Sequence, residues 1–252
     1  MKTGFAAAIA LLGSVFATSS FAADMPVKAP PRPATVAKIN WTGFYIGANV
    51  AAGWAPTRWI EDATGATPGA VDAAYTIPGP LAGGQIGFNY QIQNVVVGVE
   101  GEWDWSNLRG STSCFPFAGF ATQSCGSNIR DVATVTGRVG AVWNDALLYV
   151  KGGPAWVRTN YFNSCSNCGG LVGGLPDDWL SSDTRHGWTA GAGVEYALSP
   201  NWSAKLEYDY VGLPDHDLLF VPSLVFPFTE IVRENIQEVK LGLNYRFSLL
   251  RP

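Results

Sequence analysis

The sequence has 252 residues, enough for one domain of ordinary size, and carries 20 acidic against 16 basic residues, a formal net charge of −4. This negative balance argues against binding to nucleic acid or other polyanions. Glycine (29 residues) and tryptophan (10 residues) are abundant while only 14% of the residues are charged, a composition that favours β-structure.

The N-terminus has the three-part order of a secretory signal. Lys2 precedes an apolar stretch at residues 5–17, and a run of small residues follows at 19–23. We predict cleavage after Ala22, so that residues 1–22 are removed. The apolar stretch is also shorter than the roughly 20 residues that a membrane-spanning helix needs.

Residues 23–39 read as a proline-rich tail without a core. Proline blocks strand pairing, so this segment is expected to stay extended and outside any sheet. Its prolines are Pro26, Pro30, Pro31 and Pro33.

From Trp41 onward the sequence alternates with a period of two, with apolar residues on one parity and glycine, small or polar residues on the other. The segment 95–105 shows this most sharply, because valine and tryptophan alternate there with glycine, glutamate and aspartate. Eight such segments occur, at residues 42–54, 81–90, 95–105, 132–143, 148–156, 188–196, 202–210 and 239–247. We predict an all-β fold, an eight-stranded antiparallel up-and-down barrel over residues 40–247, followed by a short C-terminal extension at 248–252.

The connections between these segments alternate in length. Three are only a few residues long, at 91–94, 144–146 and 199–201, and four are long, at 55–80, 106–130, 158–185 and 213–234. Outer-membrane barrels have this asymmetry, with short periplasmic turns and long external loops. The tail at 23–39 is then periplasmic.

A soluble barrel of the lipocalin kind would alternate in a similar way, so the apolar face must be assigned to the outside or the inside. Aromatic residues stand near the strand ends, at the same alternate positions as the apolar residues, which is how the aromatic girdles of membrane barrels are placed. They are Trp54, Tyr90, Trp105, Trp143, Trp156, Trp188, Tyr210 and Phe247. The other parity combines glycine with charges of both signs, which suits a narrow interior. The apolar face is therefore expected to contact lipid.

The charged residues of the inward parity are expected to fill the lumen as mutually satisfied ion pairs, because buried charges must be paired and eight strands leave room for little more than side chains. The functional alternative is an ion path or a catalytic group. The residues are Glu100, Glu102, Asp104, Arg138, Lys151, Glu195, Lys205, Glu207, Asp209, Glu238, Lys240 and Arg246. Adjacent-strand pairing predicts two groups, one with the acids of 100–104 around Arg138 and Lys151, the other formed by 205–209 and 238–246.

Four cysteines follow the signal, and in an exported chain an even number favours disulfides. Proximity favours Cys114 with Cys125 and Cys165 with Cys168, while pairing between the two segments stays open. The spacing of Cys165 and Cys168 also fits a redox or zinc half-site, but neither the βαβ context nor a second ligand pair is visible.

No catalytic, cofactor or metal site is expected, and we predict that the protein is not an enzyme. The two histidines, His186 and His216, fall in or beside predicted external loops, and no serine or aspartate spacing matches a nucleophile elbow. Asp215 and Asp217 flank His216, but nothing else supports a metal site there.

Three segments, at 41–47, 98–102 and 239–247, carry a resemblance to a known family. The chain resembles the small outer-membrane β-barrels of Gram-negative bacteria, porin-family surface antigens that share the architecture of the OmpA transmembrane domain. Within the last segment, the residues that look like this family's assembly signal are Lys240, Gly242, Tyr245 and Phe247. The chain departs from the family in continuing past Phe247.

The resemblance implies a protein of the cell outer membrane with a structural or interaction role in the envelope. Its expected partners are outer-membrane lipid, the outer-membrane assembly machinery and an external ligand or surface bound through the loops. The alternative function is a narrow porin or a channel for the uptake of small solutes or ligands.

Overall fold

The computed structural model describes residues 39–61, 68–113, 123–165, 177–220 and 228–247. The predicted signal peptide, the tail up to residue 38 and the C-terminal extension lie outside these ranges. No helix among the described residues is long and apolar enough to cross a membrane.

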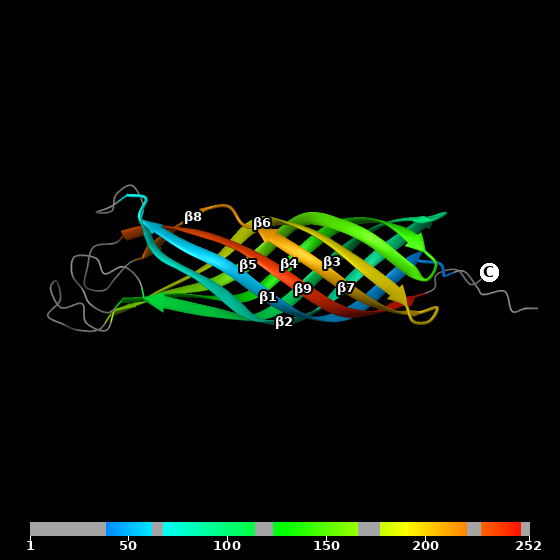
Figure 1. Cartoon of the computed structure of the whole chain (residues 1–252), viewed down its shortest axis with the longest axis horizontal. Helices are drawn as coiled ribbons and strands as arrows, with labels where there is room; N and C mark the ends of the chain where they lie inside the picture. The colour runs from blue at the N-terminus through cyan, green and yellow to red at the C-terminus, as the bar shows by residue number, and fades with distance from the viewer. Residues whose placement is uncertain (1–38, 62–67, 114–122, 166–176, 221–227, 248–252) are drawn as a thin grey trace, which may run out of the picture. The chain divides into compact units, whose positions relative to one another are not determined.

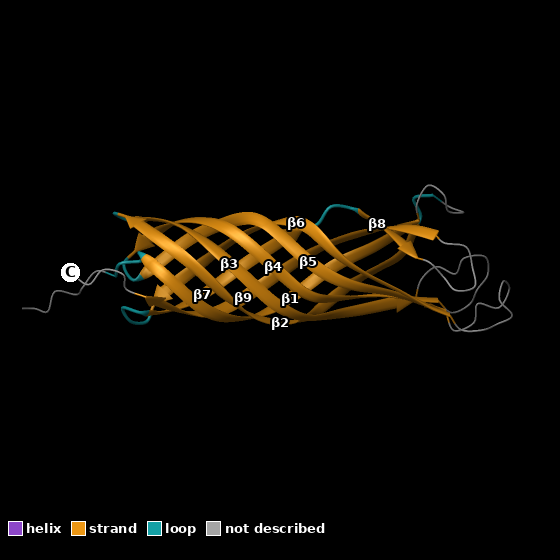
Figure 2. Ribbon diagram, turned by 180° about the vertical axis from the view of Figure 1, so that it is seen from behind, coloured by secondary structure: helices purple, strands orange, loops and turns teal. Residues whose placement is uncertain are grey.

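The described chain forms one antiparallel sheet that closes on itself, as Figures 1 and 2 show. Its strands are β1 (Gly43–Glu61), β2 (Val71–Ile92), β3 (Val95–Ser113), β4 (Gln123–Trp143), β5 (Ala146–Cys165), β6 (Asp177–Ala197), β7 (Trp202–Gly212), β8 (His216–Phe220) and β9 (Phe228–Phe247). Eight of them follow one another around the ring, and β9 pairs back onto β1. The predicted eight-stranded barrel is confirmed. The short β8, which the sequence did not indicate, pairs along the first residues of β9.

The register fixes the geometry of the ring. Starting at Phe44 on β1, the paired residues on the successive strands are Phe88, Val99, Gly137, Gly152, Ala190, Tyr210 and Gln237. Gln237 then pairs with Trp54, ten residues further along β1 than the starting point. Eight strands with this stagger enclose an interior just wide enough to be filled by side chains.

The two ends of the barrel differ. At the turn end, on the right in Figure 1, short turns join β2 to β3, β4 to β5 and β6 to β7. Gln93 and Asn144 have left-handed backbones there, with φ of 57° and 54°, as tight hairpin turns require. The longer connections lie at the opposite end, which we call the loop end.

An apolar belt covers the outside of the barrel next to the turn end. Valine, leucine and isoleucine side chains fill its middle, and residues such as Val99, Ile86 and Leu241 are each about 60% exposed. Aromatic residues border the belt on the loop side at Trp105, Trp156, Trp188 and Tyr210, and on the turn side at Phe44, Tyr90, Trp143, Tyr196, Trp202, Tyr245 and Phe247. An apolar exterior this large suits lipid rather than water.

The strands continue beyond the loop-side aromatic residues, and there apolar side chains lie on the inner face while polar side chains appear on the outer face. On β1, Ala55 and Trp59 are completely buried inside the ring, while Pro56 and Arg58 are exposed outside it. The same exchange on the other strands produces an interior apolar core at the loop end.

The prediction that residues 55–80, 106–130, 158–185 and 213–234 are loops is therefore wrong for much of their length. Continued pairing satisfies the backbone N–H and C=O groups of these residues, and the apolar side chains turn inward because the outside is no longer lipid. The strands thus reach well past the apolar belt.

Closure of the ring leads to a simple expectation for the refolded protein. A barrel without a free edge offers no starting point for unfolding by SDS, so it should stay folded until it is heated. Heated and unheated samples should migrate differently in a gel. Co-migration of the two, together with a helical circular dichroism spectrum, would contradict the fold.

Candidate functional site

The interior of the barrel gathers the charged residues that the sequence placed there. They come from β3, β4, β5, β6, β7 and β9, and each is less than a tenth exposed. In order along the chain they are Glu100, Glu102, Asp104, Arg138, Lys151, Glu195, Lys205, Glu207, Asp209, Glu238, Lys240 and Arg246. All but Arg246 take part in ion pairs with one another, and we call these eleven residues the lumen network.

Lys240 on β9 is the centre of the network on the side of the loop end. Its Nζ lies 2.8 Å from Asp104, 3.0 Å from Glu238 and 3.3 Å from Asp209. It also contacts the carboxylate of Glu102. One ammonium group therefore compensates carboxylates from β3, β7 and β9.

Lys151 on β5 and Lys205 on β7 occupy the middle of the network. The Nζ of Lys151 lies 2.6 Å from Glu207 and 3.5 Å from Glu100, and that of Lys205 lies 3.4 Å and 3.6 Å from the same two residues. Glu102 joins them, 3.2 Å from Lys205. Carboxylates and ammonium groups thus alternate across the lumen.

Arg138 on β4 closes the network towards the turn end. Its guanidinium lies over the rings of Tyr45 and Tyr149, 4.7 Å and 5.1 Å from their centroids, an arrangement that favours a cation. Its Nη1 lies 3.6 Å from Glu100 and 3.4 Å from Glu195. Tyr45 and Tyr149 were not singled out in the sequence, although both lie on the inward parity.

Two details of the sequence interpretation are wrong. Arg138 contacts neither Glu102 nor Asp104, because both reach across the lumen to Lys240 instead. The two predicted groups are also one network, since Glu102 contacts cations of β5, β7 and β9. In a barrel this narrow, long side chains meet across the interior as readily as along the sheet.

The interior is closed above and below the lumen network. At the turn end, Trp41 is completely buried and its ring lies 4.6 Å from the guanidinium carbon of Arg246. At the loop end, the interior core consists of Ala55, Ile77, Leu81, Leu108, Ile129, Val132, Ala155, Val157, Val211, Leu213 and Ile236. A second apolar cluster around Trp59 and Tyr161 lies beyond it.

A small polar group interrupts the apolar interior at the loop end. Arg185 lies 3.2 Å from Glu234, and the hydroxyl of Tyr161 donates a hydrogen bond to the same carboxylate at 3.1 Å. This buried charge is therefore paired, as burial requires. Arg185 and Glu234 were not predicted, because both fell inside segments interpreted as loops.

The arrangement is poorly suited to a metal ion. Carboxylate oxygens of Glu100, Glu102 and Glu207 lie within 4.8 Å of one another, the spacing of a metal site. Lys151 and Lys205 already supply positive charge at that place, at distances of 2.6–4.0 Å. The group is thus part of the lumen network.

The histidines lie apart from the lumen network. His186 is exposed on β6 and makes an edge contact with Trp156. His216 begins β8, and its Nε2 lies 2.9 Å from Asp183. Asp215, which flanks it in sequence, pairs instead with Arg233 at 2.8 Å.

The cysteine pairing stays a prediction. Cys125 is buried, and no cysteine of the described part of the chain is free. The register places Cys165 opposite Gln123, two residues from Cys125, so pairing between the two segments remains open. Cys114 and Cys168 lie outside the described residues.

The residues of the predicted assembly signal lie on β9. Phe247 and Tyr245 belong to the aromatic border at the turn end, whereas Lys240 points into the lumen. A Cβ on Gly242 would come within 2.8 Å of the Lys205 side chain, so this glycine makes room for the lumen network.

An antiparallel ring with an apolar, aromatic-bordered belt outside and paired charges inside is the architecture of a barrel that spans the outer membrane. The chain belongs to the family of the outer membrane protein beta-barrel domain, whose sequence model matches residues 8–247. The predicted resemblance and the predicted location in the outer membrane are confirmed.

Two relatives illustrate the family, and one solved structure illustrates the fold. A 31 kDa outer-membrane immunogenic protein of Brucella melitensis is 34% identical over 250 residues, which cover 95% of this chain and 98% of the relative. A 22 kDa outer membrane protein of Rhizobium leguminosarum bv. viciae is 29% identical over 222 residues, covering 87% and 82%. The outer membrane protease OmpT of Escherichia coli has a similar fold, with a TM-score of 0.50 at 9% identity over 81% of this chain and 97% of that one.

Proposed function

We propose that the protein is a closed barrel with a structural and surface-interaction role in the envelope, rather than a channel or an enzyme. The observation that carries this proposal is the lumen network, which fills the membrane-spanning part of the interior with paired charges. In outer-membrane barrels the short turns are periplasmic and the long connections external, so the loop end faces outward.

Two barriers along the interior, the lumen network and the interior core, would block the passage of ions. An ion entering the lumen network would have to separate carboxylates from Lys151, Lys205 or Lys240, and each such separation leaves a buried charge without its partner. The interior core next to it consists of fully buried apolar residues such as Leu108 and Ile236, which cannot replace the hydration shell of an ion.

The loop end provides the surface through which such a protein would act. The strands extend beyond the apolar belt, and there the exposed residues include polar and charged side chains such as Arg58, Ser111 and Arg158 as well as isolated apolar ones such as Leu180. The named relatives include outer-membrane immunogenic proteins, which fits surface exposure of this part of the chain. We propose an external ligand or surface as its partner, and we propose that the outer-membrane assembly machinery recognises the segment of β9 that contains Lys240, Gly242, Tyr245 and Phe247.

Conductance of the purified mature protein tests the proposal. We expect no steady current after its insertion into planar bilayers, because both barriers must open before ions pass. Each preparation should first be shown to be folded by its mobility shift on heating. A stable, reproducible open conductance from the folded protein would contradict the proposal and favour the narrow channel.

A further inference from the structure

Lysine and arginine are distributed differently between the two faces of the barrel, since arginine occurs on both faces and lysine among the described residues on only one. Every lysine among the described residues points into the lumen. Five arginines are instead exposed on the outside, all beyond the loop-side border of the apolar belt: Arg58, Arg109, Arg130, Arg158 and Arg233. At this height the outer surface of the membrane would carry its headgroups.

Three of these arginines stand together on neighbouring strands. Arg109 on β3 is two positions from Arg130 on β4 across the sheet, because its paired residue is Asn128. Arg158 on β5 pairs with Asp131, the residue next to Arg130. We call these three residues the arginine cluster.

Among the residues that the structure describes, the arginine cluster makes one ion pair, with Asp131. Asp131 lies 3.7 Å from Arg158 and its side chain is 17% exposed, so it compensates one of the three charges. No ion pair is found for Arg109 or Arg130 among the residues that the structure describes. The cluster therefore keeps a net positive charge at the level of the headgroups.

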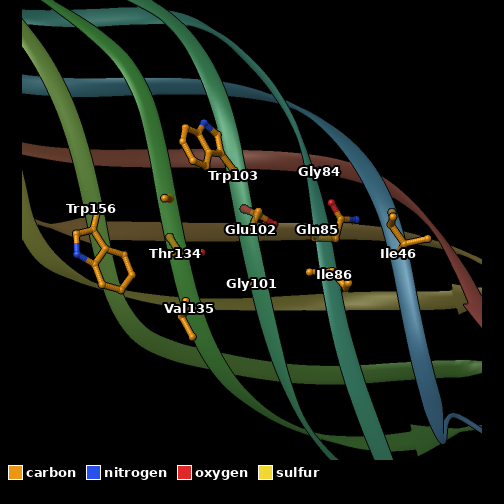
Figure 3. A pocket seen from close by; sticks show the side chains of 12 residues that line it. Ile46, Gly84, Gln85, Ile86, Gly101, Glu102, Trp103, Thr134, Val135 and Trp156 are labelled. Carbon is orange, nitrogen blue, oxygen red and sulfur yellow. The ribbon is translucent and has the colours of Figure 1, made fainter.

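An apolar groove begins directly below the arginine cluster, on the lipid-facing side. Trp103 on β3, Ala133 on β4 and Trp156 on β5 form one paired row that lines the groove. Figure 3 shows the two indole rings on either side of the strand that carries Thr134 and Val135. The next row towards the loop end is Trp105, Asp131 and Arg158. Arg158 thus lies about 7 Å from the groove along the strands, and Arg130 and Arg109 lie further towards the loop end.

Glycines make the floor of the groove. A Cβ on Gly101 would meet no atom within 4 Å, and this glycine lies between Ile86 and Val135 in one paired row. Gly84 pairs with Trp103 in the next outward-facing row towards the loop end. The groove has a volume of about 510 Å³, within the range of small-molecule sites, about 300–1,000 Å³. It opens to the bilayer, so its occupant is apolar.

We propose that this face of the barrel binds a phosphorylated lipid of the outer leaflet, with an acyl chain in the groove between Trp103 and Trp156 and the phosphate on the arginine cluster. The planar guanidinium offers paired N–H donors that match phosphate geometry, which explains arginine rather than lysine at these positions. The charge complementarity favours this occupant over a second copy of the chain, whose matching face would bring positive charge against positive charge.

Native mass spectrometry of the refolded barrel in detergent, titrated with dimyristoyl phosphatidic acid, tests the proposal. The double variant Arg109→Gln/Arg130→Gln should bind this lipid roughly 10- to 30-fold more weakly, since each basic residue at a membrane surface contributes about three- to fivefold. Gly101→Leu, which fills the groove with a side chain, should also weaken binding. Phosphatidylcholine of the same chain length should bind weakly to all variants.

The matched control is Arg58→Gln/Arg233→Gln, which removes the same charge at the same end of the barrel but on β1 and β9, away from the groove. It should bind phosphatidic acid as the wild type does. Equal losses in both double variants would overturn the proposal in favour of non-specific attraction. Unchanged binding in Gly101→Leu, with the mobility shift on heating retained, would overturn it as well. So would a wild-type protein that is dimeric in detergent and that Gly101→Leu converts into a monomer, because a second copy of the chain would then occupy the groove.

Discussion

Replacement of Lys240 by methionine should lower the free energy of unfolding by about 3–5 kcal/mol, the usual cost of removing one partner from a buried ion pair. Methionine keeps most of the volume and removes the charge. The carboxylates that lose this ammonium group are Glu102, Asp104, Asp209 and Glu238. Urea unfolding in lipid vesicles, followed by tryptophan fluorescence, measures the change.

Two controls separate charge from side-chain shape. Lys240→Arg keeps the charge and should lose much less stability than Lys240→Met. Arg58→Gln removes an exposed cation and should change the free energy of unfolding by no more than about 0.5 kcal/mol. A loss below about 1 kcal/mol in Lys240→Met would show that water, rather than Lys240, compensates these carboxylates.

Leu108→Asp should be destabilising by at least about 3 kcal/mol, because it places a carboxylate without a partner in the interior core at the loop end. Leu108 is completely buried, and the core in which it packs consists of apolar residues. The same urea measurement applies.

Ser111→Asp is the matched control for this substitution. Ser111 lies three residues further along β3 and faces outward, so the same charge there should leave stability nearly unchanged. If both variants unfold at the same urea concentration, the loop-side part of β3 is not part of a packed barrel, and the prediction of a loop for residues 106–130 would regain support.

The period-two alternation determined much of the fold without any structure. Strand side chains alternate between two faces, so the residues between Val95 and Trp105 could be divided between an outer and an inner face. The aromatic residues at the segment ends then identified the outer face as the lipid-facing one. The inward charges followed from the same parity.

A further signal was present in the sequence and was missed. On β5 the apolar side chains occupy even-numbered positions at Leu148 and Val150 but an odd-numbered position at Val157. On β9 they change from an even-numbered position at Ile236 to an odd-numbered one at Val239. Such a change marks the height at which the exterior passes from lipid to water, since only the side that faces away from water stays apolar. Read in this way, the long connections contain the outer halves of strands.

Other features were decided only by the tertiary structure. The alternation predicts which residues share a face of the sheet. Contacts across the lumen, such as that of Glu102 with Lys240, depend on the stagger of the strands and the closure of the whole ring. The arginine cluster likewise joins residues from three strands that the sequence separates by 21 to 49 positions. Local sequence determines the direction of a side chain, whereas the register of all eight strands determines which side chains it meets.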